Sequence, residues 1–491
     1  MKETTFSKFQ ELAGSAGVVP VCREIPGDLD TPVSVLERFS QDRNVVLLES
    51  VEGGERLGRY SFLGVDPYAV FTVENRVPYL SQNGDKRALE FDGNPLNALR
   101  TVLGERRVAR DPELPPLVGG AIGYLAYEAS GLFEELPEPK AQTGVPECAF
   151  MLTDNMIAFD NVRHTITVIV HVVLADYPSL PEAYIGGMER VGEIIRRLGE
   201  PVLRRTVSRP SAHVELKPEM PKQAFLDMVE RAKHHIVEGD IIQVVPSQAF
   251  SAESDISPFL VYRALRLINP SPYTFYLKLG DEILVGSSPE TLVKLENGVS
   301  LVRPIAGTRP RGNTPAADRE LEKSLLADAK ERAEHLMLVD LGRNDIGRTA
   351  EPGSVKVADF MHVERYSHVM HLVSSVSGRL RTEYDAFDLA ATAFPAGTLS
   401  GAPKVRAMEI IHELEPGPRG VYGGAVGYFS YDGNMDLAIT IRTLEVRGGR
   451  IRVQAGCGIV ADSVPENEYQ ETLNKARALF KAVEFAEKGF K

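Results

Sequence analysis

The sequence predicts an α+β fold, and three observations support this assignment. Residues 20–174 are rich in short strand-like segments, separated by turn signals such as "SQNGDKR". After Gln223, long segments with helical spacing alternate with further strands. The chain has 491 residues, which exceeds the size of one ordinary hydrophobic core. We therefore expect either two domains or one large interwoven fold.

A boundary is expected near residues 205–220. The segment "LPEAYIGGMERVGEIIRRLGE" predicts a helix, and the polar, proline-bearing segment "PVLRRTVSRPSAHVELKPEMPK" follows it directly. No internal repeat or low-complexity tract is visible in the sequence. The chain thus divides into residues 1–205, a linker at 206–220, and residues 221–491.

Three helices are predicted in the second part. In "KQAFLDMVERAKHHIVEGD", one face carries the apolar residues Phe225, Met228, Val229, Ala232, Ile236 and Val237. Residues 314–343 predict one long helix with Thr314 as its N-cap. The last helix is expected to begin with a capping box between Ser463 and Glu466 and to end before Gly489.

The composition excludes several classes of protein. The net charge is −13 with both signs interspersed, which argues against nucleic acid as a partner. The most apolar run, "ITVIVHVVLA", is too short to span a bilayer and predicts a buried strand, and no signal peptide is expected at the start. Three distant cysteines predict a reducing compartment without a disulfide framework. We therefore expect a cytoplasmic protein without membrane contacts.

Two segments carry residue types that bind anions. In "RPIAGTRPRG", residues 303–312, three arginines surround a Gly-Thr pair, and arginine forks with accessible backbone N–H groups suit a carboxylate or a phosphate. Residues 435–460 predict a hairpin that turns at Gly448-Gly449. In its first strand, Ala438, Thr440 and Arg442 share one face, which fits either an anion pocket or a surface salt bridge.

Two glutamate pairs have the spacing of neighbours on a helix. Glu331 and Glu334 are three residues apart, as are Glu468 and Glu471, so each pair shares one helix face. If the pairs faced each other, they would offer hard oxygen ligands to Mg²⁺, whereas solvated helix faces have the same spacing. No nucleophile elbow, phosphate loop or placed dinucleotide motif is visible, which argues against a phosphotransferase.

Nine motifs occur in a fixed order along the chain. They are "LLES", "NPSPYTFYL", "GSSPE", "RPIAGTRPRG", "AEHLMLVDLGRND", "YSHVMHLVS", "GAPKVRAME", "YGGAVGYF" and "IRT…VQAGCGIVADSVPENEYQET". Together they closely resemble the anthranilate synthase component I sequences of the chorismate-utilising enzyme family, over residues 47–64 and 221–485. The resemblance implies large interwoven antiparallel β-sheets wrapped by helices. It also implies a regulatory region at 1–205 and a chorismate-binding catalytic domain at 221–491.

The resemblance implies a site for chorismate and Mg²⁺. Glu334 and Glu471 would hold the ion, with Glu331 and Glu468 as outer support. The implied substrate-binding residues are Gly307, Thr308, Tyr422, Arg442, Gly456, Cys457, Gly458 and Lys475. The backbone N–H groups of residues 456–458 would bind a carboxylate of chorismate, and Cys457 replaces the small residue common in the family.

The implied reaction converts chorismate and ammonia to anthranilate and pyruvate, the first step of tryptophan biosynthesis. Ammonia attacks ring carbon C2 while the C4 hydroxyl leaves, and this poor leaving group needs a proton. Glu290 in "GSSPE" is the implied acid, so its pKa must be raised. His371 matches the family histidine in "YSHVMHLVS", where His368 also lies, and is implied in the later proton transfer.

Two positions distinguish this chain from its relatives. Isochorismate and salicylate synthases activate water with a lysine where Gln243 stands, and aminodeoxychorismate synthases carry an attacking lysine where Ala306 stands. Without either lysine, ammonia must come from outside. The chain has no recognisable glutaminase module, so a glutamine amidotransferase subunit (component II) and a hetero-oligomer are implied. Aminodeoxychorismate synthase component I and a non-catalytic amino-acid sensor on the same fold are the alternatives.

The resemblance also implies feedback inhibition by L-tryptophan. Ser50 in "LLES" and the turn formed by Pro272, Tyr273 and Thr274 match the family's tryptophan pocket. The family often has methionine where Thr274 stands.

Overall fold

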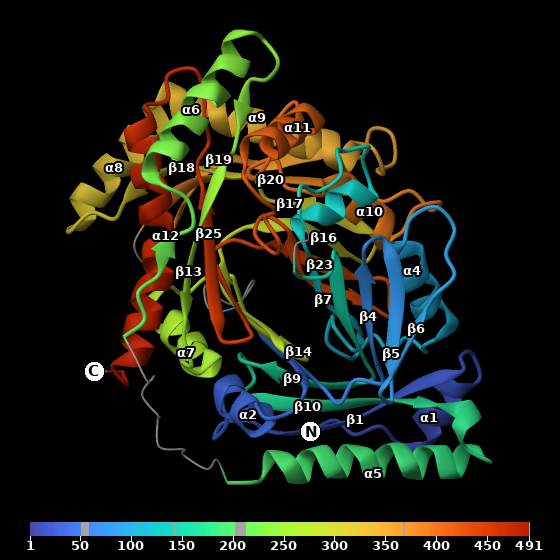
Figure 1. The fold of residues 1–491 in the computed structure, drawn as a ribbon. Coiled ribbons are helices and arrows are strands. Elements are labelled where there is room, and N and C mark those ends of the chain that lie inside the picture. The colour runs from blue at the N-terminus through green and yellow to red at the C-terminus, as the bar shows by residue number, and fades with distance from the viewer. Residues whose placement is uncertain (51–57, 142–143, 202–212, 367–368, 491) are drawn as a thin grey trace.

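Two large antiparallel β-sheets form the centre of the molecule (Figure 1). The computed structural model describes residues 1–50, 58–141, 144–201, 213–366 and 369–490. One hydrophobic cluster contains Phe62 and Phe275 from the first sheet and Ile122 and Tyr428 from the second. The two sheets therefore bury their inner faces against each other, as in a sandwich.

The first sheet contains eleven strands within the described residues, all in antiparallel pairs. In spatial order they are β1 (Val18–Pro26), β10 (Thr165–Val173), β9 (Asn155–Asp160), β3 (Tyr60–Val65), β2 (Asn44–Glu49), β14 (Tyr273–Leu279), β15 (Glu282–Ser288), β24 (Thr443–Arg447), β25 (Arg450–Gly456), β13 (Ser247–Glu253) and β11 (Lys217–Pro218). β10 is the expected buried strand.

The second sheet contains twelve strands within the described residues. In spatial order they are β18 (Ile305–Pro310), β20 (Val369–Arg379), β17 (Val299–Val302), β16 (Thr291–Glu296), β23 (Met435–Ile439), β22 (Ala425–Ser430), β7 (Gly120–Leu125), β8 (Cys148–Thr153), β4 (Ala69–Glu74), β5 (Val77–Gln82) and β6 (Asp85–Ala88), and β19 (Lys356–Arg365) also pairs with β20. A separate short ribbon joins β12 (Gln243–Val244) and β21 (Gly401–Ala402).

Helices cover the outer faces of both sheets. Those that pack on the first sheet are α1 (Phe6–Ala13), α2 (Pro32–Phe39), α5 (Leu180–Leu198), α7 (Pro258–Ile268) and α12 (Pro465–Glu487). Those that pack on the second are α4 (Leu96–Glu105), α9 (Ala329–Gly347) and α10 (Ala386–Ala393). The remaining helices are α6 (Lys222–Val237), α8 (Pro315–Ala327), α11 (Lys404–Leu414), η1 (Tyr127–Leu132) and η2 (Leu174–Asp176). In Figure 1, α5 runs along β1 and β10 at the bottom of the molecule.

Each sheet contains strands from both halves of the sequence. In the first sheet β2 pairs with β14, and in the second β7 pairs with β22. The α+β class and the expectation of interwoven antiparallel sheets wrapped by helices are therefore confirmed. Residues 206–212 of the expected linker lie outside the described residues, and the division into 1–205, 206–220 and 221–491 stays a prediction.

Two of the places where the chain passes from one sheet to the other lie beside each other. β15 of the first sheet leads into β16 of the second through Pro289 and Glu290, and β23 leads back into β24 through residues 440–442. The Ser287 N–H donates to the Arg442 carbonyl at 3.2 Å, and the Ile439 N–H donates to the Glu290 carbonyl at 3.0 Å. The prediction of a single strand through Leu437 and Arg442 is therefore wrong, because the chain changes sheets there.

The predicted helices exist, but three details differ. Asp328 ends α8 and caps α9 by accepting from Lys330 and Glu331 N–H groups, so residues 314–343 form two helices. Val237 is 79% exposed, so it does not belong to the buried face of α6. Val464 is the N-cap of α12 and has no side-chain cap, so the expected capping box is wrong.

Other local predictions are confirmed. The Thr314 hydroxyl accepts from the Ala317 N–H at the start of α8. Gly448 and Gly449 form the turn between β24 and β25, both with positive φ. Within the described part of the chain, no helix has both the length and the hydropathy of a membrane span.

Candidate active site

Glu290 lies at the crossing from β15 to β16 and is partly buried. The Thr398 hydroxyl donates to Glu290 Oε2 at 3.1 Å. Burial raises the pKa of the Glu290 carboxyl, and the hydrogen bond from Thr398 and the charges of Arg442 and Lys475 oppose that rise. The crossing therefore holds a carboxyl that keeps its proton to a higher pH than an exposed glutamate would, within electrostatic reach of two cations.

Arg442 occupies the second crossing in a strained backbone conformation. Its φ of 49° lies in the left-handed region, which costs a non-glycine residue about 1–2 kcal/mol. The hydrogen bond from the Ser287 N–H to its carbonyl helps to hold it there. Its charge acts on Glu290 and contributes to lowering the pKa of His371. The acid, the arginine and the histidine thus belong to one electrostatic environment.

His371 lies beside Gly307 and Thr308, where β18 pairs with β20. A β-bulge at Gly307 interrupts this pairing, and Thr308 is the register partner of His371. His371 Nδ1 is 3.1 Å from the Gly307 carbonyl oxygen and 3.0 Å from Thr308 Oγ1. A carbonyl can only accept, so Nδ1 carries the proton and Nε2 keeps its lone pair. Burial lowers the pKa of the His371 ring, which favours this neutral form.

The two glutamate pairs lie on α9 and α12 and influence each other. Burial and the charge of Glu331 raise the pKa of Glu334, and Glu471 from the other helix adds to the rise. Burial raises the pKa of Glu468, with a further contribution from Glu471. A cluster of carboxylates that resist ionisation is stabilised by a cation, and hard oxygen donors suit Mg²⁺. The donor set therefore fits the expected ion.

The four carboxylates do not form a closed set of ligands. No three of them, all described in the structure, bring an oxygen within 4.8 Å of one another. Two are held by side-chain cations: Arg309 pairs with Glu331 at 3.2 Å, and Lys475 pairs with Glu471 at 2.8 Å. Cationic side chains thus neutralise part of the acidic cluster.

A tighter group of metal-ligand types lies elsewhere among the described residues. His235, Glu238 and Asp240 have ligand atoms within 4.8 Å of one another. Asp240 already accepts from Arg406 at 2.8 Å and contacts His235 Nδ1 at 2.8 Å. Its charge is thus compensated by protein groups, and we assign no ion to this group.

The predicted carboxylate-binding loop lies at the end of β25. Lys475 Nζ donates to the Gly456 carbonyl at 3.0 Å, and a Cβ at Gly456 would be 2.8 Å from the Tyr422 hydroxyl. The Cys457 N–H donates to the Pro246 carbonyl at 3.1 Å, so the fold already uses one of the three predicted backbone donors. Lys475 and Tyr422 thus lie directly beside this loop.

The two positions that distinguish the relatives lie within the same region. A Cβ at Gly458 would be 2.5 Å from Gln243 Nε2, so the Gln243 amide packs on the predicted substrate loop. Ala306 is buried in β18, directly before the bulge at Gly307. Both side chains therefore border the predicted substrate residues.

Comparisons with known proteins identify the family of this chain. A sequence model of the chorismate binding enzyme family matches residues 43–481. The chain is 46% identical to anthranilate synthase component 1 from Acetivibrio thermocellus over 98% of each chain, and 46% identical to that from Neisseria meningitidis serogroup A over 96% of each. The chain belongs to the chorismate-binding enzyme family.

Solved structures of this family share the fold. Anthranilate synthase component I from Streptococcus pneumoniae TIGR4 is 41% identical, with a TM-score of 0.78 over 86% of this chain and 92% of that one. The menaquinone-specific isochorismate synthase from Escherichia coli has a TM-score of 0.71 over 97% of this chain and 98% of that one. At 19% identity, the second likeness concerns the fold alone.

The arginines of "RPIAGTRPRG" do not form the anion site that their number suggested. Arg303 pairs with Glu364, Arg309 with Asp328 and Glu331, and Arg311 with Asp318. Each guanidinium is thus neutralised by protein carboxylates. Arg442 and Lys475, by contrast, are the predicted substrate-binding cations whose charges act on Glu290.

The residues predicted for tryptophan line one cavity between the sheets. Ser50, Pro272, Tyr273 and Thr274 all border a space of about 190 Å³. Its other walls include cationic and acidic side chains: Arg59, Lys294, Arg303, Glu49 and Asp436. These charged side chains are paired within the protein, so an amino acid in the cavity would have to share or replace such pairings with its ammonium and carboxylate groups.

Thr398 is a site residue that the sequence analysis missed. It precedes the "GAPKVRAME" motif and is the hydrogen-bond donor to Glu290. A lone threonine in a loop has no periodicity or spacing that could have indicated this contact. His368, the second histidine of its motif, lies outside the described residues.

We expect Gly307→Ala to destabilise the protein more than Gly298→Ala does. Both glycines have similar φ values, 75° and 78°, so both variants incur the left-handed penalty of about 1–2 kcal/mol. A Cβ at Gly307 would also lie 3.2 Å from Glu331 Oε2 and from Leu325 Cδ1, whereas one at Gly298 meets no atom within 4 Å. Urea unfolding measures both free energies, and equal losses would contradict close packing at the bulge.

Proposed function

We propose that this chain is the chorismate-converting subunit of an anthranilate synthase. It forms anthranilate and pyruvate from chorismate and ammonia, the first committed use of chorismate for tryptophan. The observation that carries the proposal is the pairing of an acid, Glu290, with a site that has glutamine at 243 and alanine at 306. Such a site can protonate a leaving group and has neither a lysine base for water nor a built-in amine nucleophile.

In the first step, a C2–N bond forms, the two ring double bonds shift, and the C4–O bond breaks. Glu290 donates its proton to the departing hydroxyl, which leaves as water. Arg442 and Lys475 hold the carboxylates of chorismate, and Tyr422, Thr308 and the loop at residues 456–458 complete the binding surface. Holding the substrate in this orientation lowers the entropic part of the barrier.

In the second step, the C2 proton is removed and the C3–O bond breaks, which makes the ring aromatic. His371 accepts that proton through Nε2, because its Nδ1–H is directed to the Gly307 carbonyl. The released enolpyruvate takes a proton on its methylene carbon and becomes pyruvate. The burial that lowers the pKa of His371 keeps it in the neutral form that can act as a base.

Mg²⁺ would be held by Glu334 and Glu471, with Glu331 and Glu468 in support, and would neutralise the ring carboxylate of chorismate. Lys475 would then exchange its pairing with Glu471 for contact with the substrate. The pKa rises at Glu334 and Glu468 support this assignment, because burial and then the neighbouring carboxylates disfavour the ionised forms, which a cation would stabilise.

The ammonia would come from glutamine through a separate amidotransferase subunit. The chain offers no recognisable glutaminase module, and the relatives' name, component 1, is consistent with a second component. Inhibition by L-tryptophan would act from the 190 Å³ cavity, with Ser50 and Thr274 at its wall.

The direct test is a product assay with the purified chain. With chorismate, Mg²⁺ and ammonium, we expect anthranilate and pyruvate in equal amounts, identified by mass spectrometry. Glutamine should not replace ammonium, and excess chelator should abolish turnover. Glu334→Gln removes one predicted metal ligand without changing the size of the side chain. It should lose activity and unfold at a urea concentration similar to that of the unaltered chain. Formation of aminodeoxychorismate or isochorismate would contradict the proposal.

We expect Thr398→Val to change the pH dependence of turnover. Because Glu290 must be protonated, kcat/KM falls as the pH rises through its pKa. The Thr398 hydrogen bond lowers that pKa, so its loss should move the falling limb to higher pH. The rising limb, assigned to His371, should stay in place. Thr392→Val removes a hydroxyl bonded to the Leu389 carbonyl and serves as a control; identical profiles for both variants would refute the acid assignment.

We expect tryptophan inhibition to depend on the cavity between the sheets. Ser50→Arg would place a long cationic side chain in a space of about 190 Å³ and should abolish inhibition while turnover persists. Ser15→Arg, at an exposed site near α1, is the control. By linkage, tryptophan and chorismate should weaken each other's binding by one shared factor. An unchanged inhibition curve for Ser50→Arg would place the inhibitor elsewhere.

A further inference from the structure

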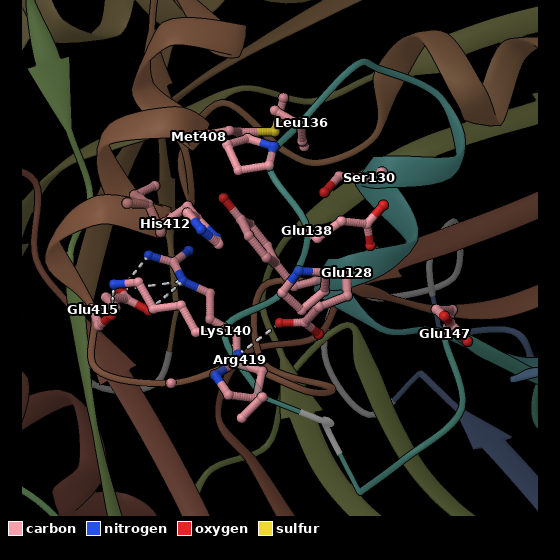
Figure 2. Close-up of a pocket in the computed structure, with 18 of the residues that line it drawn as sticks. Glu128, Ser130, Leu136, Glu138, Lys140, Glu147, Met408, His412, Glu415 and Arg419 are labelled. Carbon is pink, nitrogen blue, oxygen red and sulfur yellow. Dashed lines mark hydrogen bonds and ion pairs between the residues drawn. The ribbon is translucent and has the colours of Figure 1, made fainter. Parts of the chain in front are cut away.

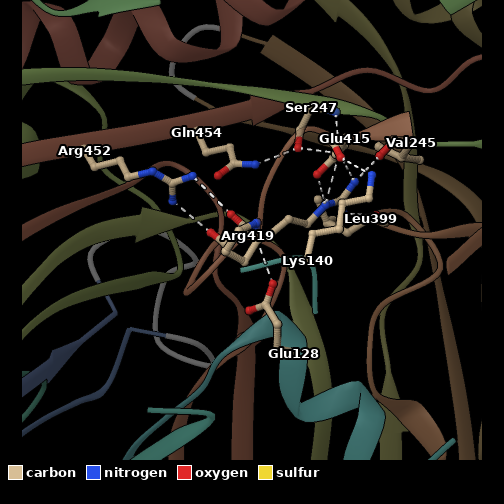
Figure 3. Close-up of polar contacts among 10 residues, drawn as sticks. Glu128, Lys140, Val245, Ser247, Leu399, Glu415, Arg419, Arg452 and Gln454 are labelled. Atoms are coloured by element: carbon tan, nitrogen blue, oxygen red, sulfur yellow. Dashed lines mark hydrogen bonds and ion pairs between the residues drawn. The ribbon is translucent and has the colours of Figure 1, made fainter. Parts of the chain in front are cut away.

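A fully buried ion pair lies behind the candidate site. Arg419 is 1% exposed and Glu415 is 4% exposed. Arg419 Nη2 donates to Glu415 Oε1 at 2.6 Å, and Arg419 Nε donates to Glu415 Oε2 at 3.0 Å (Figure 3). This two-pronged geometry is one that a guanidinium can form and an ammonium cannot.

The rest of the Arg419 side chain holds two chain segments of the site. Its Nη1 donates to the Leu399 carbonyl at 2.7 Å, and its Nη2 donates to the Val245 carbonyl at 2.6 Å. Leu399 follows Thr398, the donor to Glu290. Val245 precedes Pro246, whose carbonyl accepts the Cys457 N–H. Arg419 thus holds two segments. One carries Thr398, the donor to Glu290, and the other carries Pro246, which bonds to the predicted carboxylate-binding loop.

Arg419 also lies against an aromatic wall of the site. Its guanidinium carbon is 5.7 Å from the centre of the Tyr422 ring and 4.4 Å from that of Tyr127. Tyr422 is a predicted substrate-binding residue whose hydroxyl is next to Gly456. The stacking therefore orients the ring from behind.

Glu415 fixes a further strand. It accepts from the Ser247 N–H and the Ser247 hydroxyl, both at 2.8 Å, and Gln454 donates to that hydroxyl at 2.8 Å. Ser247 is the register partner of Gly456. Glu415 thus holds β13 beside the loop at residues 456–458. Arg419 acts on the same loop through its bond to the Val245 carbonyl.

A cavity borders this ion pair. It has a volume of about 360 Å³ and is lined by Glu128, His412, Glu415 and Arg419, whose side chains are drawn in Figure 2. None of the residues that line it is among the predicted substrate or metal residues. Glu128 fixes the backbone there by accepting from the Arg419 and Gly420 N–H groups.

We propose that Glu415 and Arg419 are positioning residues for chorismate conversion. They touch neither substrate nor reacting atoms, because the pair is buried and its groups already bond to protein. They set the relative positions of the Thr398–Glu290 contact, the Tyr422 ring and the loop at residues 456–458. The expected loss of kcat/KM rests on the proposed function. The expected loss of chorismate affinity requires only that the chain binds chorismate.

The experiment compares Arg419→Lys with Arg106→Lys in the full chain. Arg106 pairs with Asp154 and lies 3.6 Å from the Tyr68 ring centre, so it is a partly buried ion pair with a comparable stack whose partners lie outside the site. We expect both variants to lose stability to urea. Only Arg419→Lys should lower kcat/KM, by roughly 10- to 100-fold, because a misplacement of about 1 Å can cost that much.

Chorismate affinity, measured by calorimetry with Mg²⁺, gives the second readout. Arg419→Lys should weaken it roughly tenfold, and Arg106→Lys should not. The kcat losses of Arg419→Lys and Thr398→Val should combine less than multiplicatively, since both act on Glu290. If the wild-type chain binds chorismate but forms no anthranilate, the proposed function fails, and the affinities still decide this inference.

Two outcomes overturn the proposal. One is a folded Arg419→Lys variant with kcat, KM and chorismate affinity within twofold of Arg106→Lys. The other applies if Arg419→Lys does not fold. Ser247→Ala removes a single hydroxyl from the network and should then weaken chorismate binding. An unchanged chorismate affinity in Ser247→Ala would refute the positioning role. A weakened affinity in Ser247→Ala supports it.

Discussion

Two backbone hydrogen bonds between neighbouring sheet crossings hold the two residues, Glu290 and Arg442, on which the proposed chemistry depends. The bond from the Ser287 N–H to the Arg442 carbonyl and that from the Ile439 N–H to the Glu290 carbonyl join segments far apart in sequence. Each crossing leaves its residue outside regular strand pairing, so Glu290 and Arg442 can face a ligand. The strained φ of Arg442 is maintained because both flanking strands are fixed in different sheets.

Local patterns predicted the elements well and the crossings poorly. The Thr314 cap and the Gly448-Gly449 turn have local causes, so sequence was sufficient. The apolar alternation through Leu437 and Ile439 could not predict the change of sheet that follows. Alternation shows which face of a strand is buried, and it does not show which sheet the strand joins. The family motifs predicted the site residues. Thr398 and the buried Arg419 carry no local signal, since an i,i+4 acid–base pair usually marks a surface.

The two candidate ligand sites share one pair of strands. Thr274, at the wall of the cavity between the sheets, is the register partner of Ser287, whose N–H holds the Arg442 carbonyl. A ligand that displaces β14 against β15 therefore acts on the arginine through a single strand pairing. Feedback in this fold would need no extended pathway, because the inhibitor cavity and the crossing are built on adjacent residues of the same hairpin.

The interleaving of early and late strands has a consequence for synthesis on the ribosome. β7 ends at Leu125, and its partner β22 begins at Ala425, 300 residues later. At roughly 5–20 residues per second, the edge of β7 waits tens of seconds for that partner. Unpaired strand edges of this kind invite association with other chains. Until residues 425–430 emerge, the nascent chain therefore presents the edge of β7 to other chains, and the second sheet cannot be completed.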